Sequence, residues 1–336
     1  MLVVGWSFTS QCNLRCIHCY NASGEPHSDE LTHEQALAVA KKLIDYEVDA
    51  VNFGGGECPL RKDFFEVCKI LYDAGIKLSL TTNGLTYKRV APFIELFHDI
   101  GVSIDFADSE KHDAFRGLEG AFVKSLEAIN FFVSKGVNTE IVTCITRLNS
   151  NRKELKKLHA LAKALSVDYW RLNRYNPLGR EGHKDALRLN PDDLRKVHSY
   201  LAGLISDLTV PDPLFALVGK KVSSCPCGKT SFRIQPNGEV TPCIYLKVSG
   251  GNILKNSIRE IMSSPVFKAI RNRDLTGTKC ESCHLKDSCN GGCAGAAFAE
   301  YSSFNHPDPM CWLEEKWNVH EKYLCTVYVP MGGDGK

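Results

Sequence analysis

The hydrophobic positions follow two spacings in the first half of the chain. Short apolar runs of strand length alternate with longer segments in which apolar residues recur at helical spacing. We predict strands at residues 2–8, 48–53, 76–82, 102–106, 138–145 and 167–172. Between them we predict helices at 31–46, about 62–74, about 86–98, about 121–135 and about 151–165. The pattern therefore predicts six strand–helix units.

Local signals mark the ends of several predicted helices. The segment 31–46 opens with a Thr-x-x-Gln capping box. Gly75, Gly101 and Gly136 each stand where a glycine ends a helix in left-handed geometry. A further helix is predicted at about 192–207, and the irregular passage after it predicts a domain boundary near 210–222.

Alternating strands and helices indicate an α/β fold of parallel strands joined by right-handed crossovers. Six units are too few for a complete eight-stranded barrel. We therefore predict a partial (β/α)6 TIM-like barrel. In such a fold, ligands gather at the carboxyl ends of the strands, so the loops that follow the strands are the places to look for chemistry.

Composition narrows the class of protein. With 336 residues, 43% of them apolar, the chain can bury a large core and is long enough for two domains. Lys and Arg number 41 against 39 Asp and Glu, which gives no basic field for nucleic acid. The start lacks the pattern of a signal peptide, and no apolar run has the length of a membrane span. We expect a soluble, cytoplasmic protein with neither a nucleic-acid nor a membrane partner.

Cysteines are the most informative residues. There are fifteen, of which three lie within QCNLRCIHCY near the start and eight lie from Cys225 to Cys311. The other four are scattered, at Cys58, Cys68, Cys144 and Cys325. The odd total and a reducing compartment argue against a disulfide framework, so metal binding is the better interpretation.

The N-terminal cysteines, Cys12, Cys16 and Cys19, form one short loop after the first predicted strand. A closed zinc site needs four ligands, and His18 sits awkwardly between two of the cysteines for that purpose. A cubane iron–sulfur cluster held by three thiolates instead leaves one iron open to a small molecule. The loop after the second strand, GGGEC at 54–58, offers free amides and a glutamate, Glu57, that could accept a hydrogen bond from an amino group.

These residues resemble the radical S-adenosylmethionine (SAM) superfamily. Cys12, Cys16, His18 and Cys19 match its C-x3-C-x-(aromatic)-C signature, and Gly55, Gly56 and Glu57 match its Gly-Gly-Glu motif. The resemblance implies that the three thiolates hold a 4Fe-4S cluster and that SAM chelates the open iron. It also implies that SAM is then cleaved to methionine and a 5′-deoxyadenosyl radical.

The resemblance also implies which residues contact SAM. His18 would pack near the adenine, and Glu57 would lie by the methionyl amino group. Ser103 and Arg116 match positions that contact the ribose and the carboxylate. The chain departs from the family at Cys58, where proline is common and where we expect the edge of the pocket; Pro59 follows one place later.

The second group of cysteines follows the pattern Cys225-x-Cys227, Gly238-x4-Cys243, Cys280-x2-Cys283-x5-Cys289-x3-Cys293 and then Cys311. This pattern resembles the SPASM extension of radical SAM maturases. Its spacing does not match paired zinc knuckles, which makes a zinc ribbon the weaker alternative. The resemblance assigns one auxiliary 4Fe-4S cluster to Cys280, Cys283, Cys289 and Cys311. It assigns another to Cys243 and Cys293, completed by Cys225, Cys227 or both. The chain would then carry three clusters.

The expected organisation has three parts. Residues 1–185 form the radical SAM barrel, 186–222 a helical linker, and 223–329 the SPASM domain. The end of that last part carries Trp312, Trp317 and Tyr323 at near-helical spacing, which predicts a helix capping the barrel.

Three functions fit the sequence to different degrees. The first is a maturase that oxidatively modifies a ribosomally made peptide, for example by crosslinking it. The second is an enzyme acting on a small molecule such as a heme-pathway tetrapyrrole. The third is a non-catalytic metal protein, against which the intact triad and Gly-Gly-Glu loop argue. Ile244 stands where sulfatase-maturating members have an aspartate, which argues against sulfatase maturation.

The expected partners follow from the first function. Because the first predicted strand begins at residue 2, there is no room for the N-terminal winged-helix domain that binds peptides in many maturases. We therefore expect either that a separate recognition protein delivers the peptide or that the substrate is small. An electron donor such as flavodoxin or ferredoxin is also expected. The sequence does not identify the substrate, the bond that is formed, or the catalytic acid or base.

Overall fold

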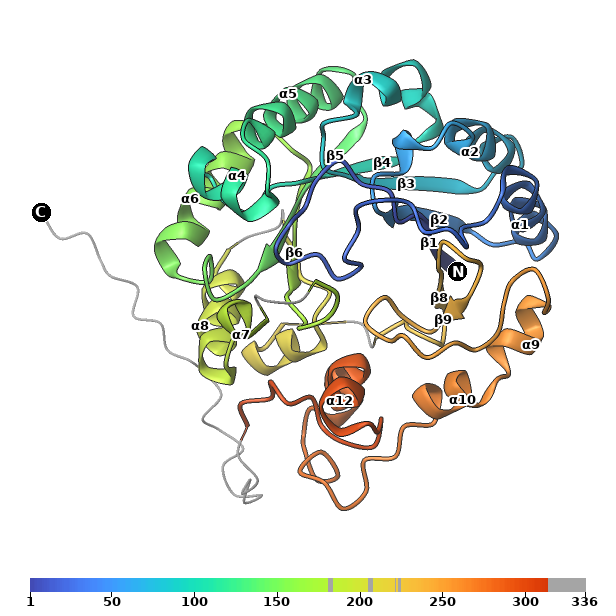
Figure 1. Ribbon diagram of the computed structural model, residues 1–336. Helices are drawn as coiled ribbons and strands as arrows, with labels where there is room; N and C mark the ends of the chain where they lie inside the picture. Colours follow the sequence, from blue (N-terminus) through green and yellow to red (C-terminus); the bar gives the residue numbers. More distant parts are fainter. Residues whose placement is uncertain (181–183, 205–207, 221, 223–224, 314–336) are drawn as a thin grey trace, which may run out of the picture.

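The computed structural model describes residues 1–180, 184–204, 208–220, 222 and 225–313. Its centre is a sheet of nine strands in the order β7-β6-β5-β4-β3-β2-β1-β8-β9. All neighbouring strands run parallel except β8 and β9. The strands are β1 (Val3–Thr9), β2 (Ala50–Gly55), β3 (Lys77–Thr82), β4 (Asp99–Ser103), β5 (Asn138–Ile145), β6 (Tyr169–Arg174), β7 (Leu208–Thr209), β8 (Ser231–Ile234) and β9 (Val240–Thr241). Figure 1 shows the strands curving into an incomplete ring.

Helices cover the outside of this ring (Figure 1). The barrel helices are α1 (His33–Asp45), α2 (Phe64–Asp73), α3 (Tyr87–Val90), α4 (Ser109–Arg116), α5 (Ala121–Ser134) and α6 (Arg152–Ala164), followed by α7 (Lys184–Leu187) and α8 (Pro191–Ala202). The C-terminal helices are α9 (Ile258–Met262), α10 (Pro265–Arg271), α11 (Lys286–Cys289) and α12 (Ala294–Tyr301). Three 3-10 helices complete the set: η1 (Cys58–Leu60), η2 (Ala91–Leu96) and η3 (Pro213–Val218).

The predicted partial barrel is confirmed, and each predicted strand is found within a few residues of its expected place. The prediction of a single helix at 86–98 is wrong. The segment instead forms the short α3 and then η2, and the first turn of η2 contains a proline. Helix α4 was not expected. It begins after Asp108, whose side chain accepts a hydrogen bond from the amide of Lys111, and it ends at Gly117 in left-handed geometry.

Two of the three predicted helix-ending glycines are confirmed. Gly75 and Gly136 have φ of 83° and 72° just after a helix. The prediction for Gly101 is wrong, because Gly101 lies inside β4, which starts at Asp99. A Cβ at Gly101 would lie 2.8 Å from Cγ2 of Val142, so glycine is needed there for space inside the barrel.

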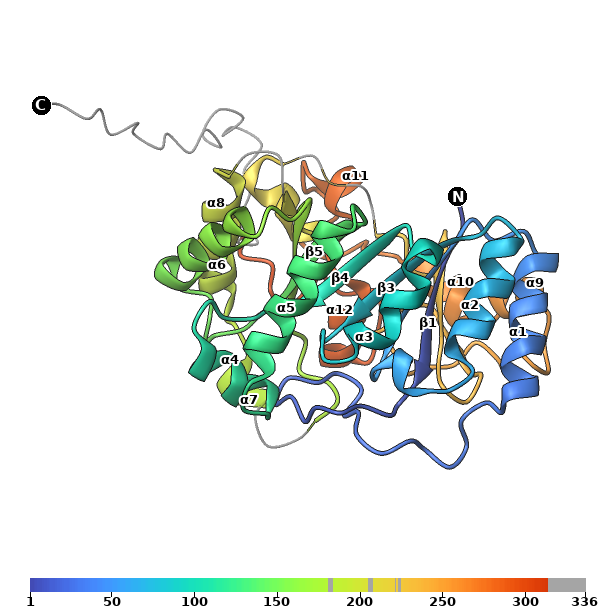
Figure 2. The ribbon, with the colours of Figure 1, turned by 90° about the horizontal axis from the view of Figure 1, so that it is seen from above.

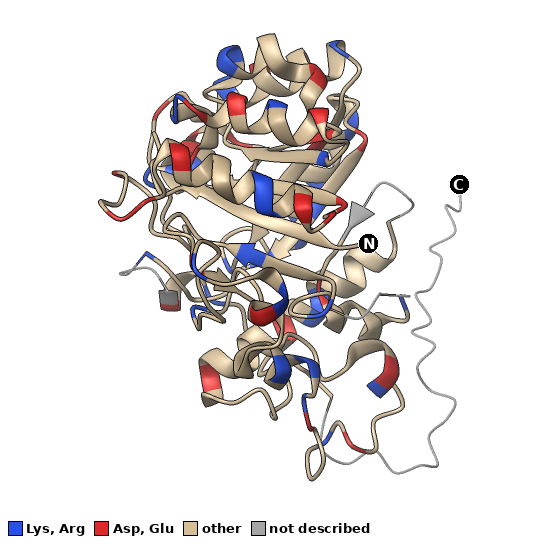
Figure 3. Ribbon diagram, turned by 90° about the vertical axis from the view of Figure 1, so that its right-hand side faces the viewer, with Lys and Arg blue, Asp and Glu red and all other residues tan. Residues whose placement is uncertain are grey.

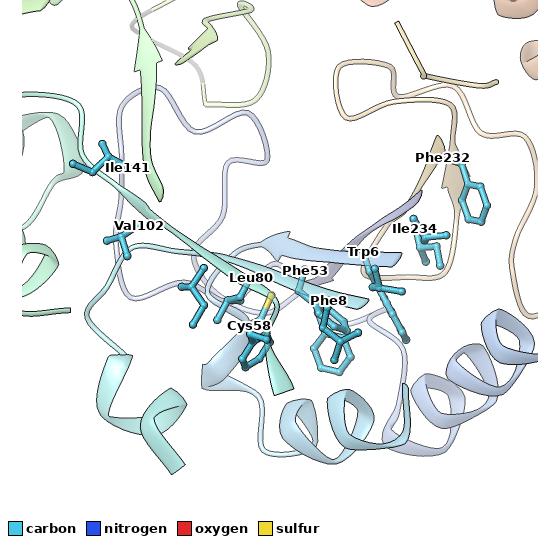
Figure 4. Packing of buried hydrophobic residues seen from close by; sticks show 14 of the residues in the cluster. Trp6, Phe8, Phe53, Cys58, Leu80, Val102, Ile141, Phe232 and Ile234 are labelled. Atoms are coloured by element: carbon cyan, nitrogen blue, oxygen red, sulfur yellow. The ribbon is translucent and has the colours of Figure 1, made fainter. Parts of the chain in front are cut away.

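The two faces of the barrel sheet differ in chemistry. Trp6, Phe53 and Leu80 point toward the helices and are fully buried, and Trp6 stacks on Phe53 with ring centroids 5.8 Å apart (Figure 4). The opposite face carries glycines and polar residues such as Ser7 and Asn52. Since successive residues of a strand point to opposite faces, the alternation leaves a polar interior inside an apolar shell.

Cys58 belongs to the apolar shell (Figure 4). It is completely buried, and its Sγ lies 3.2 Å from the carbonyl oxygen of Gly54. The expectation that Cys58 lies at the edge of the pocket is wrong, because the turn of η1 points the side chain toward the core.

The C-terminal part continues the barrel sheet. Strand β8 pairs in parallel with β1, so that Arg233 lies opposite Gly5. Lys42 of α1 donates hydrogen bonds to the carbonyls of Ile253 and Leu254. Helices α9, α10 and α12 gather beside this edge of the ring (Figures 1 and 2). The N-terminal cysteine loop and the segments with Cys227 and Cys243 are therefore attached to one continuous sheet.

The predicted capping helix falls largely outside the described residues, which end at residue 313. Trp312 is described, and its ring contacts the ring of His198 at 5.6 Å. Along the ribbon in Figure 3, positions of Lys and Arg are interspersed with positions of Asp and Glu. Among the described residues, we find no helix with the length and apolar character needed to span a membrane.

Candidate active site

The N-terminal cysteine loop crosses the carboxyl end of the barrel (Figure 1). Two backbone hydrogen bonds close it at its base, from the amide of Cys12 to the carbonyl of Gly24 and from the amide of Gly24 to the carbonyl of Ser10. The carboxylate of Glu30 accepts further hydrogen bonds from Thr9 Oγ1 at 2.8 Å and from the amide of Ser10 at 2.6 Å. The loop is thus a closed unit attached to the end of β1.

Helix α4 and the loop after β6 hold this unit over the barrel. Phe115 of α4 accepts a hydrogen bond from the amide of Ile17, and its ring stacks on His18 at 4.3 Å. After β6, Arg180 donates from Nε to the carbonyl of Cys16 at 2.8 Å and from Nη2 to the carbonyl of Ser23 at 2.6 Å. A Cβ at Gly179 would lie 2.2 Å from the carbonyl oxygen of Cys19, so the backbones touch here.

The predicted SAM-site residues converge on one cavity of 320 Å³. Its lining includes every one of them: Cys12, Cys16, His18, Cys19, Gly55, Gly56, Glu57, Ser103 and Arg116. They come from the loop after β1, the end of β2 and the turn that follows it, the end of β4, and α4, which places the cavity where a parallel barrel binds its ligands.

Glu57 is 1% exposed, and three donors from the end of β3 hold its carboxylate. The hydroxyls of Thr82 and Thr86 donate to Oε1, and the amide of Asn83 donates to Oε2 at 3.0 Å. Burial raises the pKa of Glu57, and these hydrogen bonds oppose the rise. The carboxylate is therefore fixed in orientation at the cavity wall.

Arg116 lies between an acid and a thiol. Its Nε donates to Asp105 Oδ2 at 2.7 Å, and its Nη1 lies 3.9 Å from Cys16 Sγ. Burial is the largest single influence on the pKa of Asp105 and raises it. The Arg116 guanidinium, together with His18, His112 and the amide of Cys144, outweighs burial, so the pKa of Asp105 is lowered. This buried ion pair places a positive charge beside one of the three cysteines, where it would stabilise a thiolate.

His18 is a neutral side chain with an unused polar atom. Burial lowers the pKa of His18 to about 3. Its Nδ1 is buried and has no hydrogen-bond partner within the described chain. A buried polar atom without a partner is costly, so a ligand that bonds to it would remove that cost.

A second cavity of 490 Å³ adjoins the first. Cys225, Cys227, Cys243 and Cys293 all line it. The pKa of the Cys225 thiol is raised, first by its hydrogen bond with Cys227 and then by burial. Seven residues line both cavities: Asn52, Asn173, Arg174, Asn176, Arg233, Ile244 and Tyr245. We call these seven residues the shared wall.

The other four C-terminal cysteines form a separate group. The pKa of Cys289 is raised to about 12, first by burial and then by the nearby Cys311 and Cys280 thiols. Burial likewise raises the pKa of Cys280, followed by the effects of Cys311 and Cys283. The eight cysteines thus divide in space into the two groups that the resemblance implied, and both Cys225 and Cys227 lie with Cys243 and Cys293.

The thiol sets fit iron–sulfur clusters in donor type and number, with three thiols in the first and four in each of the others. Among the described residues, no three His, Cys, Asp or Glu side chains are arranged to hold a single metal ion. The fit is supported by Arg116 beside Cys16 and by the unpaired Nδ1 of His18.

Sequence reasoning missed several residues of the site. Arg174, at the end of β6, forms a buried ion pair with Asp308, Nη2 to Oδ2 at 2.7 Å. Asp308 Oδ2 also accepts a hydrogen bond from the amide of Cys293 at 2.9 Å. Cys144 and Tyr20 line the first cavity. Position at a strand end was the one available signal for Arg174, and nothing local pointed to Asp308.

Comparison with known proteins agrees with this geometry. Residues 6–162 match the family model of the radical SAM superfamily, and residues 225–290 match that of SPASM, an iron–sulfur cluster-binding domain. The chain belongs to the radical SAM superfamily and carries a SPASM domain. It is therefore an enzyme that uses SAM, a SAM-binding 4Fe-4S cluster and auxiliary clusters.

Two relatives cover most of the chain. The mycofactocin maturase MftC of Mycolicibacterium smegmatis is 29% identical over 326 residues, covering 91% of this chain and 81% of that protein. The AdoMet-dependent heme synthase of Methanosarcina barkeri is 28% identical over 338 residues, covering 92% and 95%.

Among solved structures, Streptococcus suis SuiB bound to S-adenosylmethionine superposes with a TM-score of 0.75 at 18% identity. The match covers 93% of this chain and 77% of that one. SuiB bound to its precursor peptide SuiA gives the same TM-score at 17% identity. At this identity the likeness establishes the fold of both parts of the chain.

We expect Arg180→Gln to loosen the N-terminal cysteine loop, because it removes the donors to the carbonyls of Cys16 and Ser23. After anaerobic reconstitution, the variant should lose up to about a third of the iron, the share of one four-iron cluster in three. Iron analysis and a SAM-binding assay check this. Arg188→Gln is the control, since Arg188 pairs with Glu300 at the surface. Unchanged iron together with unchanged SAM affinity would contradict the role of Arg180.

Proposed function

We propose that this enzyme is a radical SAM/SPASM maturase that oxidatively modifies a ribosomally synthesised peptide, by crosslinking or another change of bonding. The observation that carries the proposal is the shared wall between the SAM-site cavity and the cavity of the C-terminal thiols. A substrate held there would reach both sites. The similarity to the maturase MftC over 91% of the chain supports the same assignment.

On this proposal, Cys12, Cys16 and Cys19 hold the SAM-binding cluster. Together with SAM, that cluster supplies a 5′-deoxyadenosyl radical for hydrogen abstraction. The protein's own part is to orient the cofactor. Gly55 and Gly56 leave room for the start of the cysteine loop, because a Cβ there would lie 2.8 Å from the carbonyl oxygen of Thr9 and 2.0 Å from that of Gln11. Glu57, fixed by Thr82, Asn83 and Thr86, receives the methionyl amino group.

The remaining SAM contacts are assigned in the same way. His18 packs against the adenine, and its unpaired Nδ1 forms a hydrogen bond with the adenine. Ser103 contacts the ribose. Arg116 reaches the carboxylate from the side of Cys16, while Asp105 keeps its guanidinium in place.

The eight C-terminal cysteines are assigned to two auxiliary clusters. Cys225, Cys227, Cys243 and Cys293 hold the one beside the shared wall, with all four thiols as ligands. Cys280, Cys283, Cys289 and Cys311 hold the other. An oxidative modification leaves an electron to remove from the substrate radical, and a cluster next to the shared wall is suited to accept it.

We further propose that a separate recognition protein delivers the peptide and that a flavodoxin or ferredoxin supplies the electron for SAM cleavage. We place the enzyme in the cytoplasm. A tetrapyrrole is the less favoured substrate, supported by the similarity to the heme synthase of Methanosarcina barkeri.

The test is a reaction of the enzyme with the short peptide whose coding sequence lies nearest to the gene of the enzyme. The reconstituted enzyme, with SAM and a reductant, should form 5′-deoxyadenosine and a peptide that has lost two hydrogen atoms, both followed by mass spectrometry. The Cys12, Cys16 and Cys19 triple alanine variant should form neither. Decarboxylation of a heme-pathway tetrapyrrole with no change in any neighbouring peptide would refute the maturase.

The assignment of four thiols beside the shared wall makes a second prediction. Cys225→Ala and Cys227→Ala should each lose or degrade one cluster in Mössbauer spectra, because each removes a ligand from a closed set. Cys68→Ala is the control, since Cys68 lies on the buried face of α2 in the apolar core. A Cys225 or Cys227 variant with three intact clusters and full activity would show that the missing thiol is not a ligand.

A further inference from the structure

Four arginines line the two cavities, and three of them are paired with acids. Arg116 binds Asp105. Arg171 Nη2 lies 3.1 Å from Glu140 Oε2. Arg174 Nη2 lies 2.7 Å from Asp308 Oδ2. Each of these positive charges is therefore balanced within the protein.

Arg233 is the fourth arginine, and its partners are hydroxyl groups. Nε donates to Ser7 Oγ at 3.0 Å, and Nη2 donates to the Tyr20 hydroxyl at 3.0 Å. No carboxylate among the described residues forms an ion pair with it. Because a guanidinium has five N–H groups, these two hydrogen bonds leave Nη1 and part of Nη2 available.

The sequence makes room for this side chain. A Cβ at Gly5 would lie 2.8 Å from Arg233 Cδ, and a Cβ at Gly54 would lie 3.2 Å from its Nη2. The guanidinium thus passes over two glycines on adjacent strands β1 and β2. Packing of this kind fixes the direction of a side chain that would otherwise sample many rotamers.

The surroundings of Arg233 favour an anion that also carries amide groups. The shared wall contains no acidic residue. It does contain three carboxamides, from Asn52, Asn173 and Asn176, whose N–H and C=O groups match those of a peptide backbone. An unbalanced cation in a partly buried cavity is costly unless an anion joins it.

We propose that Arg233 binds a carboxylate of the substrate and so positions the reacting part of the peptide at the shared wall. This proposal rests on the proposed function and names the group that the site recognises. The planar guanidinium suits two-point binding of a carboxylate, which an ammonium cannot reproduce. Of the two sources of carboxylate, the substrate fits better than SAM. Arg233 lies on β8 and borders both cavities, whereas the predicted SAM contacts line the first.

The test measures binding on immobilised, cluster-loaded enzyme by weak-affinity chromatography under anaerobic conditions. The probes are N-acetyl-trialanine with a free carboxylate, its C-terminal amide, and N-acetyl-Ala-Glu-Ala amide. At least one probe with a carboxylate should bind about tenfold more tightly than the neutral amide, the effect of one charge-assisted contact. The two acidic probes distinguish a terminal carboxylate from a side-chain carboxylate.

Arg233→Gln should abolish this preference, and Arg233→Lys should keep only part of it. The control is the double variant Arg171→Gln with Glu140→Gln, which removes a balanced pair from the same cavity and should keep the preference. Iron content checks that each variant is folded and loaded.

Equal binding of acidic and neutral probes by the wild type would overturn the proposal. So would an Arg233→Gln variant that loses SAM affinity but keeps the preference among the peptides, because the carboxylate would then be that of SAM. These results do not depend on turnover, so they are separate from a failure of the maturase reaction itself.

Discussion

The strict division between the two faces of the barrel sheet is the constraint on which the rest of the structure depends. On one face, β1, β2 and β3 carry alternating apolar side chains that pack under the helices, as Trp6, Phe53 and Leu80 do. The other residues are left for the interior, where glycine and polar groups stand. Burial of the outer face stabilises the sheet, so the inner face is free to form a polar cavity.

This cavity becomes a site because distant segments close over it. The cysteine loop is held by Phe115 after β4 and by Arg180 after β6. The buried pair of Arg174 and Asp308 joins β6 to the C-terminal part, next to the amide of Cys293. Removing one member of such a pair costs about 3–5 kcal/mol, so these contacts fix the relative positions of the two thiol sites.

The sequence was sufficient to predict the barrel, because apolar spacing is a local pattern that located the strands. The grouping of the cysteines came from the resemblance to known families, and the structure brings the same thiols together. The sequence was insufficient where the role of a residue depends on a contact with a residue far away in the chain. Gly101 was taken for a helix end because the side chains of Val142 and Arg171 that crowd it come from other strands. The pairing of β8 with β1 and the position of Arg233 could not be predicted for the same reason.

Iron stoichiometry tests the central claim most directly, namely that the thiols form three independent cluster sites. Anaerobically reconstituted wild-type protein should hold about twelve irons per chain, from three four-iron clusters. The variant with Cys12, Cys16 and Cys19 all replaced by alanine should hold about eight irons, because the C-terminal thiols are unaffected. Zinc in place of iron, or a triple variant that retains the full iron content of the wild type, would contradict the account.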